Sequence, residues 1–158
     1  MIFVTVGTQL PFDRLIRAVD EIAPLLNGER IVAQTNGGRY IARNIECKSY
    51  FPADEFNTLI RQSRMIISHA GTGSIISVLT YKKPIIIMPR RASLGEHRNE
   101  HQLATARKMD ELKFVNVAYD EHQLQKQILN SEVQCLQGLG DKASDSLILS
   151  LKHFILDE

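Results

Sequence analysis

The chain has 158 residues, of which 44% are hydrophobic and 23% are charged. This length suits one domain, and the composition is that of an ordinary globular protein, which argues against a disordered, collagen-like or coiled-coil chain. The sequence contains 19 Lys and Arg and 18 Asp and Glu residues, for a formal charge of +1. Proteins that bind nucleic acid through its phosphates are usually far more basic, so we expect no nucleic-acid partner.

The N-terminal residues 1–6 carry no basic segment and no small-residue cleavage site, so they predict a first strand and not a signal peptide. Apolar runs such as residues 85–88 are far shorter than the roughly 20 residues that span a bilayer. Cys47 and Cys135 stand apart, without a metal-binding spacing. These features predict a cytoplasmic protein with unpaired thiols.

Runs rich in Val and Ile alternate with stretches of helical periodicity, which predicts an α/β fold with a mainly parallel, open sheet and helices on both faces. The strands are mostly continuous apolar runs, as expected when both faces are covered. They are predicted at residues 2–6, 30–35, 65–69, 84–88 and 114–117, with a weaker candidate at 45–50. Helices are predicted at residues 11–26, 54–62, 72–81, 98–112 and 121–129.

A last amphipathic helix is predicted within residues 141–158, where Leu147, Leu151, Phe154 and Ile155 share one side. This apolar stripe could cover the protein's own sheet or enter a groove of a partner, and the sequence leaves both possibilities open. We expect residues 1–158 to form a single domain.

Two glycine-containing turns follow predicted strands, where ligands bind in open α/β sheets. The first contains Gly7 and Thr8, and the second, at residues 71–74, begins a helix. Glycines let the backbone approach a ligand, and the free N–H groups of a helix start attract an anion, so the second turn suits a phosphate. It matches neither GxGxxG nor the P-loop. A tight turn with a helix cap would use the same residue types.

Arginines and other polar residues follow the strand predicted at 84–88. Arg90, Arg91 and Arg98 would add cations to the same edge, and together with the glycine turns they suggest a diphosphate ligand. Taken singly, an arginine is more often a surface residue. The neighbouring side chains suit sugar hydroxyls, although they could equally cap a helix. They are Glu96, His97, Asn99, His101 and Gln102.

Candidates for catalysis and metal binding are few. His97 and His101 are four residues apart, but there is no HExxH motif and no clear third ligand, so we expect no metal. His69 and Glu96 are the candidates for a catalytic group, with His69 as a possible general base. No complete nucleophile or acid/base set can be assembled from the sequence.

Four segments, at residues 3–15, 67–74, 83–90 and 96–102, resemble the C-terminal domain of family 28 glycosyltransferases, in the family's order. The resemblance runs from residue 1 to about residue 129. It is greatest to the short stand-alone members. These are soluble subunits of two-part transferases in bacterial exopolysaccharide and capsule synthesis, and the catalytic subunit that adds the second N-acetylglucosamine to dolichol diphosphate in eukaryotes.

The resemblance implies the Rossmann-like half of a GT-B enzyme, which holds a UDP-sugar. It further implies that a membrane-associated partner subunit binds a lipid-diphosphate-linked acceptor, to which a hexose-type sugar is transferred at the cytoplasmic face. No metal cofactor is expected. In single-chain relatives the base that activates the acceptor sits in the other domain, which corresponds to the partner here, and the sequence leaves open whether the base is on this chain. This chain alone is expected to bind the donor and transfer little.

The same resemblance assigns the site residues. Gly7 and Thr8 match the first loop beside the cleft, and Ser77 stands where larger members carry a ribose-binding glutamate, which weakens that contact. The diphosphate cradle falls on Gly71, Thr72, Gly73 and Ser74, and the segment that grips donor sugar and ribose on Glu96, Asn99, His101 and Gln102.

Two alternatives remain open at this stage. One is a non-catalytic protein that binds a sugar nucleotide and regulates a partner. The other is a homo-oligomeric enzyme that acts on a small phosphorylated substrate without a partner.

Overall fold

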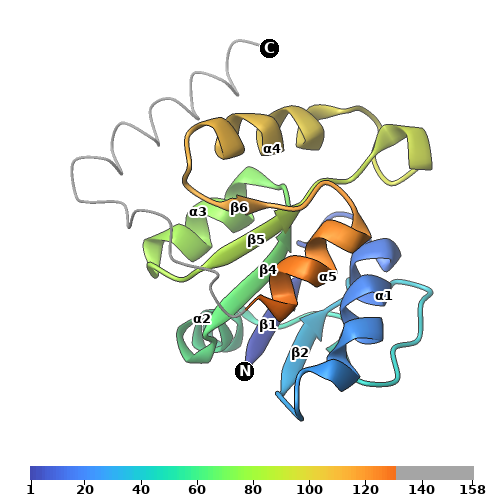
Figure 1. The fold of residues 1–158 in the computed structure, drawn as a ribbon, viewed down its shortest axis with the longest axis vertical. Helices are drawn as coiled ribbons and strands as arrows, with labels where there is room; N and C mark the ends of the chain where they lie inside the picture. Colours follow the sequence, from blue (N-terminus) through green and yellow to red (C-terminus); the bar gives the residue numbers. More distant parts are fainter. Residues whose placement is uncertain (131–158) are drawn as a thin grey trace.

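The computed structural model describes residues 1–130, which form a six-stranded parallel sheet between two layers of helices (Figure 1). The strand order is β3-β2-β1-β4-β5-β6, so the direction of winding reverses between β1 and β4. This reversal is the topological switch point, where open α/β sheets bind ligands. The strands are β1 (Ile2–Thr5), β2 (Ile31–Gln34), β3 (Glu46–Lys48), β4 (Met65–His69), β5 (Ile85–Met88) and β6 (Asn116–Val117).

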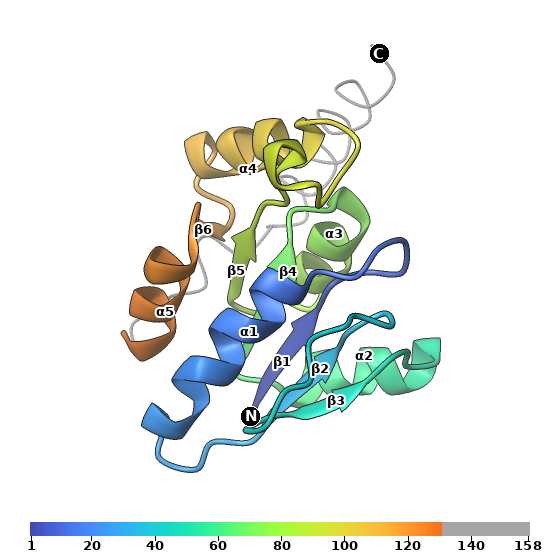
Figure 2. The same ribbon diagram turned by 90° about the vertical axis from the view of Figure 1, so that its right-hand side faces the viewer.

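The helices cover both faces of the sheet. Helices α1 and α5 lie side by side on one face, and α2 and α3 lie on the other (Figures 1 and 2). The expected Rossmann-like open sheet with helices on both faces is therefore confirmed. The helices are α1 (Asp13–Ile22), α2 (Ala53–Gln62), α3 (Thr72–Thr80), α4 (His101–Glu111) and α5 (Glu121–Leu129), with short 3₁₀ turns at Ala23–Leu25 and Ala92–Leu94.

The alternation of side chains along each strand divides the core into two layers. In β1, Ile2 and Val4 pack toward α1 and α5, whereas Phe3 between them packs toward α2 and α3. Phe3 meets the rings of Phe51 and Phe56 edge to face, at centroid distances of 6.0 and 5.2 Å. Successive residues of a strand point to opposite faces, so a continuous apolar run is what a sheet covered on both sides requires.

Helix α1 ends at Ile22, earlier than the predicted residue 26, because Pro24 has no N–H to donate to the carbonyl of Asp20. The side-chain amide of Asn44 donates to that carbonyl instead, at 3.1 Å. The buried Asp20 carboxylate also accepts the Asn44 N–H at 2.7 Å and the Tyr40 hydroxyl at 2.8 Å. Burial alone would raise the pKa of Asp20, but these hydrogen bonds outweigh it and lower the pKa. The connection from β2 to β3 is thereby fixed to α1.

The edge strand β3 differs from the central strands in burial. All three of its residues are exposed, and Glu46 forms an ion pair with Arg30 of the neighbouring chain segment, with the two groups 2.8 Å apart. A short, charged edge strand discourages pairing with another chain. The prediction of strands covered on both faces therefore holds for β1, β2, β4 and β5, whereas β6 has one half-buried and one buried residue. The weaker candidate at residues 45–50 forms the exposed edge strand β3.

Helix α4 begins at His101, three residues later than predicted. The Asn99 side-chain oxygen accepts the N–H of His101 at 3.2 Å and lies 3.0 Å from Nδ1 of His97. Side chains that bond to the nearby backbone in this way compete with helix formation. Residues 97–100 therefore form a turn that precedes the helix.

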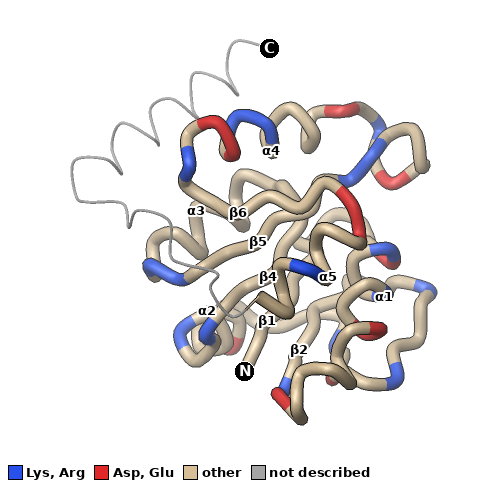
Figure 3. The backbone as a smooth tube through the Cα atoms, viewed as in Figure 1, with Lys and Arg blue, Asp and Glu red and all other residues tan. Residues whose placement is uncertain are grey.

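Basic and acidic residues are interspersed over the described elements, with no continuous basic stripe among residues 1–130 (Figure 3). None of the helices in this part of the chain is long and apolar enough to cross a bilayer. The helix predicted within residues 141–158, its proposed docking stripe and Cys135 all lie outside the described residues. The assignment of residues 1–158 to one domain stays a prediction.

Candidate functional site

A cavity of about 470 Å³ opens at the carboxyl ends of the strands, at the switch point between β1 and β4. Its wall combines the two glycine turns, the end of β2, the start of α2 and the start of α4. The lining residues are Thr5, Gly7, Thr8, Gln9, Gln34, Tyr50, Phe51, Ala53, Phe56, His69, Ala70, Gly71, Thr72, Gly73, Ser74, Arg90, His97, His101 and Gln102.

The N-terminus of α3 opens into this cavity. Thr72, Gly73 and Ser74 line the wall, and no side chain caps the first turn of the helix. Uncapped N–H groups and the positive end of the helix dipole attract an anion. A Cβ atom added to Gly73 would meet no atom within 4 Å, so the backbone here is open to an approaching ligand.

At Gly71 and Gly7, the imidazole of His69 leaves no room for a side chain. A Cβ atom on Gly71 would lie 2.2 Å from Nε2 of His69, and one on Gly7 would lie 2.6 Å from Cε1. Gly7 also has a φ of +77°, a conformation that L side chains rarely adopt. The two glycine turns are thus held apart by one buried ring.

His69 is poorly suited to the role of general base. Burial, with a further contribution from the charge of Arg90, lowers its pKa from 6.5 to about 3. An imidazole with so low a pKa accepts a proton weakly near neutral pH. The geometry favours a neutral ring that spaces the two turns.

Arg90 is the cation of this cavity. Its side chain is buried, and its Nη2 donates to the carbonyl oxygens of Val6 and Leu10, at 2.8 and 2.5 Å. Its guanidinium also lies over the Phe12 ring, 5.1 Å from the centroid, and its Nε has no partner in the described protein. Burial lowers the pKa of Arg90 to about 10, which leaves it charged at neutral pH.

Arg91 and Arg98 do not join Arg90 there, contrary to expectation. Neither lines the cavity. Arg91 donates to the carbonyl of Tyr119, and Arg98 is exposed. One of the three expected cations therefore lines the cavity. Arg91 follows Arg90 in extended backbone, in which successive side chains point to opposite sides.

Of the five polar residues predicted after β5 to bind sugar hydroxyls, three line the cavity and two do not. His97, His101 and Gln102 line the cavity, and Gln102 also accepts the backbone N–H of Arg90 at 3.2 Å. Glu96 and Asn99 do not line it, since Asn99 caps the preceding turn and Glu96 is bound to Arg14.

Ser77 also lies outside the cavity wall. Its hydroxyl donates to the carbonyl of Gly73 at 2.9 Å, one turn back along α3. A serine that bonds in this way satisfies its own helix, so the structure gives no separate support for its role in ribose binding.

Several wall residues were missed in the sequence, above all Tyr50, Phe51 and Phe56 at the β3–α2 connection. Gln34 was missed as well. It donates to the carbonyl of Gly7 at 3.1 Å and accepts the N–H of Phe51 at 3.2 Å, which joins this connection to the first glycine turn. The sequence offered one indication for Tyr50. Residue 50 ends the weak strand candidate at residues 45–50, and the carboxyl ends of the strands form the edge of the sheet at which ligands bind.

Among residues 1–130, no group of three His, Cys, Asp or Glu side chains could hold a metal ion. The chemistry on the cavity wall suits an anion and a polyol, with helix N–H groups, one guanidinium, three imidazoles and three side-chain amides.

A family model described as the glycosyltransferase family 28 C-terminal domain matches residues 1–149. The chain belongs to this family. A human relative, UDP-N-acetylglucosamine transferase subunit ALG13, is 30% identical over 118 residues, which are 68% of this chain and 10% of the human protein. The chain spans less than a third of the length of the curated relatives first matched.

Solved structures agree on the fold. The solution structure of ALG13 superposes with a TM-score of 0.67 at 22% identity, covering 95% of this chain and 94% of that one. The calicheamicin glycosyltransferase CalG4 gives a TM-score of 0.58 at 12% identity, covering 98% of this chain and 37% of CalG4. The described sheet is thus the Rossmann-like half of a GT-B fold.

Proposed function

We propose that this chain is the donor-binding subunit of a two-chain glycosyltransferase and that its cavity holds a UDP-sugar. The observation that carries the proposal is the uncapped start of α3, which opens into the cavity at the switch point beside Arg90. Family membership supports the same reading.

The proposed arrangement of the donor follows from the chemistry of the wall. The diphosphate lies against Thr72, Gly73 and Ser74, whose N–H groups and helix dipole favour negative charge. The donor sugar and ribose lie toward His101 and Gln102. Glu96, Asn99 and Ser77, implied by the resemblance, would reach the donor only after their present bonds are exchanged.

Transfer of the sugar leaves a UDP diphosphate whose negative charge grows as the glycosidic bond breaks. The α3 N-terminus and Arg90 would stabilise this charge without a metal ion. The base that activates the acceptor is proposed to come from the partner, because burial holds the pKa of His69, the candidate base on this chain, at about 3.

The acceptor is proposed to be a lipid-diphosphate-linked sugar, bound by a membrane-associated partner that brings this chain to the cytoplasmic face. The human relative is named as a subunit of a UDP-N-acetylglucosamine transferase, which supports both an assembly and that donor among the UDP-sugars to test. A place in exopolysaccharide or capsule synthesis is part of the proposal that rests on the sequence resemblance alone.

The test is transfer of a radiolabelled sugar from UDP-N-acetylglucosamine, UDP-glucose or UDP-galactose into lipid. The purified chain is assayed alone, with membranes from cells lacking its gene, and as the Gly73→Glu variant with those membranes. Label extracted into lipid and released by mild acid, only with wild-type chain plus membranes, is the expected result. Turnover by the chain alone would favour the small-substrate enzyme, and binding of UDP without any transfer would favour a regulator.

A further inference from the structure

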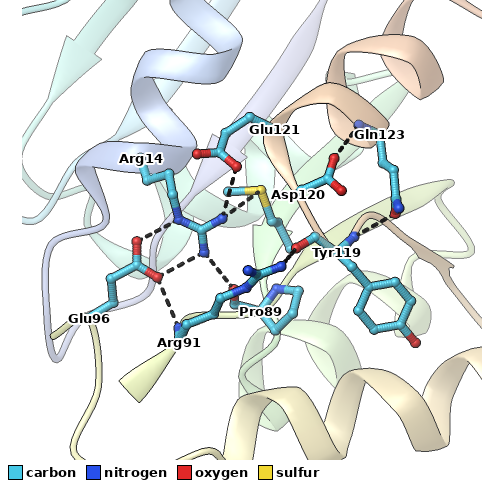
Figure 4. A network of polar contacts seen from close by, with 9 residues as sticks. Arg14, Pro89, Arg91, Glu96, Tyr119, Asp120, Glu121 and Gln123 are labelled. Atoms are coloured by element: carbon cyan, nitrogen blue, oxygen red, sulfur yellow. Dashed lines mark hydrogen bonds and ion pairs between the residues drawn. The ribbon is translucent and has the colours of Figure 1, made fainter. Parts of the chain in front are cut away.

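Arg14 joins three separated parts of the chain beside the cavity (Figure 4). Its Nε and Nη2 donate to the two carboxylate oxygens of Glu96, at 2.6 and 2.8 Å. Nη2 also donates to the carbonyl of Pro89 at 3.0 Å, and Nη1 reaches a carboxylate oxygen of Glu121 at 3.3 Å. The start of α1, the segment after β5 and the start of α5 are thereby held by one guanidinium.

The contacts of Glu96 fix the course of the segment between β5 and α4. One carboxylate oxygen of Glu96 accepts the N–H of Arg91 at 2.9 Å, and the backbone N–H of Glu96 donates to the carbonyl of Arg91 at 3.2 Å. The 3₁₀ turn at Ala92–Leu94 is closed by these bonds. The next residues along the chain, His97 and His101, line the cavity.

The Arg14–Glu96 pair is largely shielded from water, with side chains 13% and 14% exposed. Burial works against the charge of Arg14, but its hydrogen bonds to Glu96 and the charges of Glu96 and Glu121 outweigh burial and raise its pKa. The comparable pair of Arg30 and Glu46 is 59% exposed on both sides. Two-bond Arg–carboxylate pairs fix orientation as well as distance, and a shielded one does so most firmly.

We propose that Arg14 is a positioning residue of the donor site, which it serves by holding Glu96 and through it His97, His101 and Gln102, which line the cavity. The inference rests on the proposed function for the identity of the ligand. Glu96 is a positioning residue as well. Its carboxylate acts through its hydrogen bonds with Arg14 and the N–H of Arg91 and does not contact the sugar.

A double-mutant cycle separates this role from direct contact. Binding of the UDP-sugar used in transfer is measured by calorimetry for the full chain, Arg14→Met, Glu96→Gln and the double variant. We expect each single change to weaken binding about tenfold, as for the loss of one good hydrogen bond, and the double change to weaken it no further. Losses that multiply to about a hundredfold would overturn the inference, because Glu96 would then act independently of Arg14.

Arg30→Met is the matched control, since it removes an equally forked but exposed pair at the other edge of the sheet. We expect it to leave binding unchanged. If Arg14→Met does not fold, Arg14→Lys takes its place in the cycle, because lysine keeps the charge but cannot donate to both oxygens of Glu96 at once.

The imidazole proton signals of His97 and His101 provide a readout that needs no ligand. Arg14→Met and Glu96→Gln should shift both signals, and Arg30→Met should shift neither. Unchanged signals of His97 and His101 in both variants would overturn the positioning role. A wild-type protein that binds no UDP-sugar, either alone or with the proposed partner subunit, while these signals still shift would instead reject the proposed function and leave the positioning of the segment intact.

Discussion

The turn after β4 and the longer segment after β5 bring polar residues to the same cavity, but different contacts set their course. In the turn, Gly71 accommodates the ring of His69 two residues away, and α3 begins at the next residue. The segment after β5 is held by Arg14, which lies 82 positions from Glu96 in the sequence. Contacts between sequence neighbours set the course of the turn, and contacts between distant residues set the course of the longer segment. We therefore expect substitutions in the two regions to have different effects on stability and binding.

The largest effect is expected for Gly71→Ala. The new Cβ atom would lie 2.2 Å from Nε2 of His69, and Gly7 blocks the ring on its other side. Overpacking of this kind should lower the free energy of unfolding by about 3 kcal/mol. Thermal and urea unfolding measure the loss, and Gly73→Ala is the control, since its Cβ atom would meet no neighbour and should cost nothing.

A second change in the same place makes the test specific. His69→Ala, added to Gly71→Ala, removes the ring that the methyl group strikes. The pair should therefore cost less than the sum of the two single changes. A simple sum would show that the ring of His69 is not what requires glycine at residue 71.

The next effect is expected for Arg14→Met, which leaves the shielded Glu96 without its two-bond partner and removes the ion pair with Glu121. The free energy of unfolding should fall by about 2 kcal/mol. Arg30→Met should change stability little, because its pair is exposed and surface ion pairs contribute little. Equal losses in the two variants would mean that the shielding of the Arg14 pair has no energetic consequence.

A smaller effect is expected from pH, through His69. The pKa of His69 is about 3 in the folded protein, against 6.5 for an ordinary histidine. Below pH 6.5, His69 is protonated in the unfolded chain but stays neutral in the folded protein. The contribution of neutral His69 to the free energy of unfolding is therefore fully present well above pH 6.5. It is lost as the pH falls, by about 1 kcal/mol between pH 6.5 and 5.5. His69→Gln should remove this part of the slope in urea unfolding measured across that range.

The comparison also explains what the sequence could predict. The strands could be predicted because a β1 residue such as Phe3 and its neighbours form an unbroken apolar run, which a sheet covered on both faces requires. The place of Gly73 beside a cavity could be predicted because it depends only on the adjacent strand and helix.

Other features could not be predicted, because they depend on partners far along the chain. Glu96 is just as polar as His101, and nothing near it in the sequence shows that Arg14 binds it. The burial of Arg90 against the carbonyl of Val6 is a contact of the same kind. Tyr50 and Phe51 were missed because β3 has only three residues, so its ligand edge was poorly defined.

The most direct test of the account is calorimetric titration of the full chain with UDP, alone and in complex with the proposed partner subunit. Wild type and Gly73→Ala should bind alike. Gly73→Glu places a carboxylate where the diphosphate would lie, so it should lose at least about tenfold in affinity at an unchanged melting temperature. A wild-type protein that binds no UDP in either form, or a Gly73→Glu variant that binds UDP as well as wild type, would contradict the placement of the diphosphate at the start of α3.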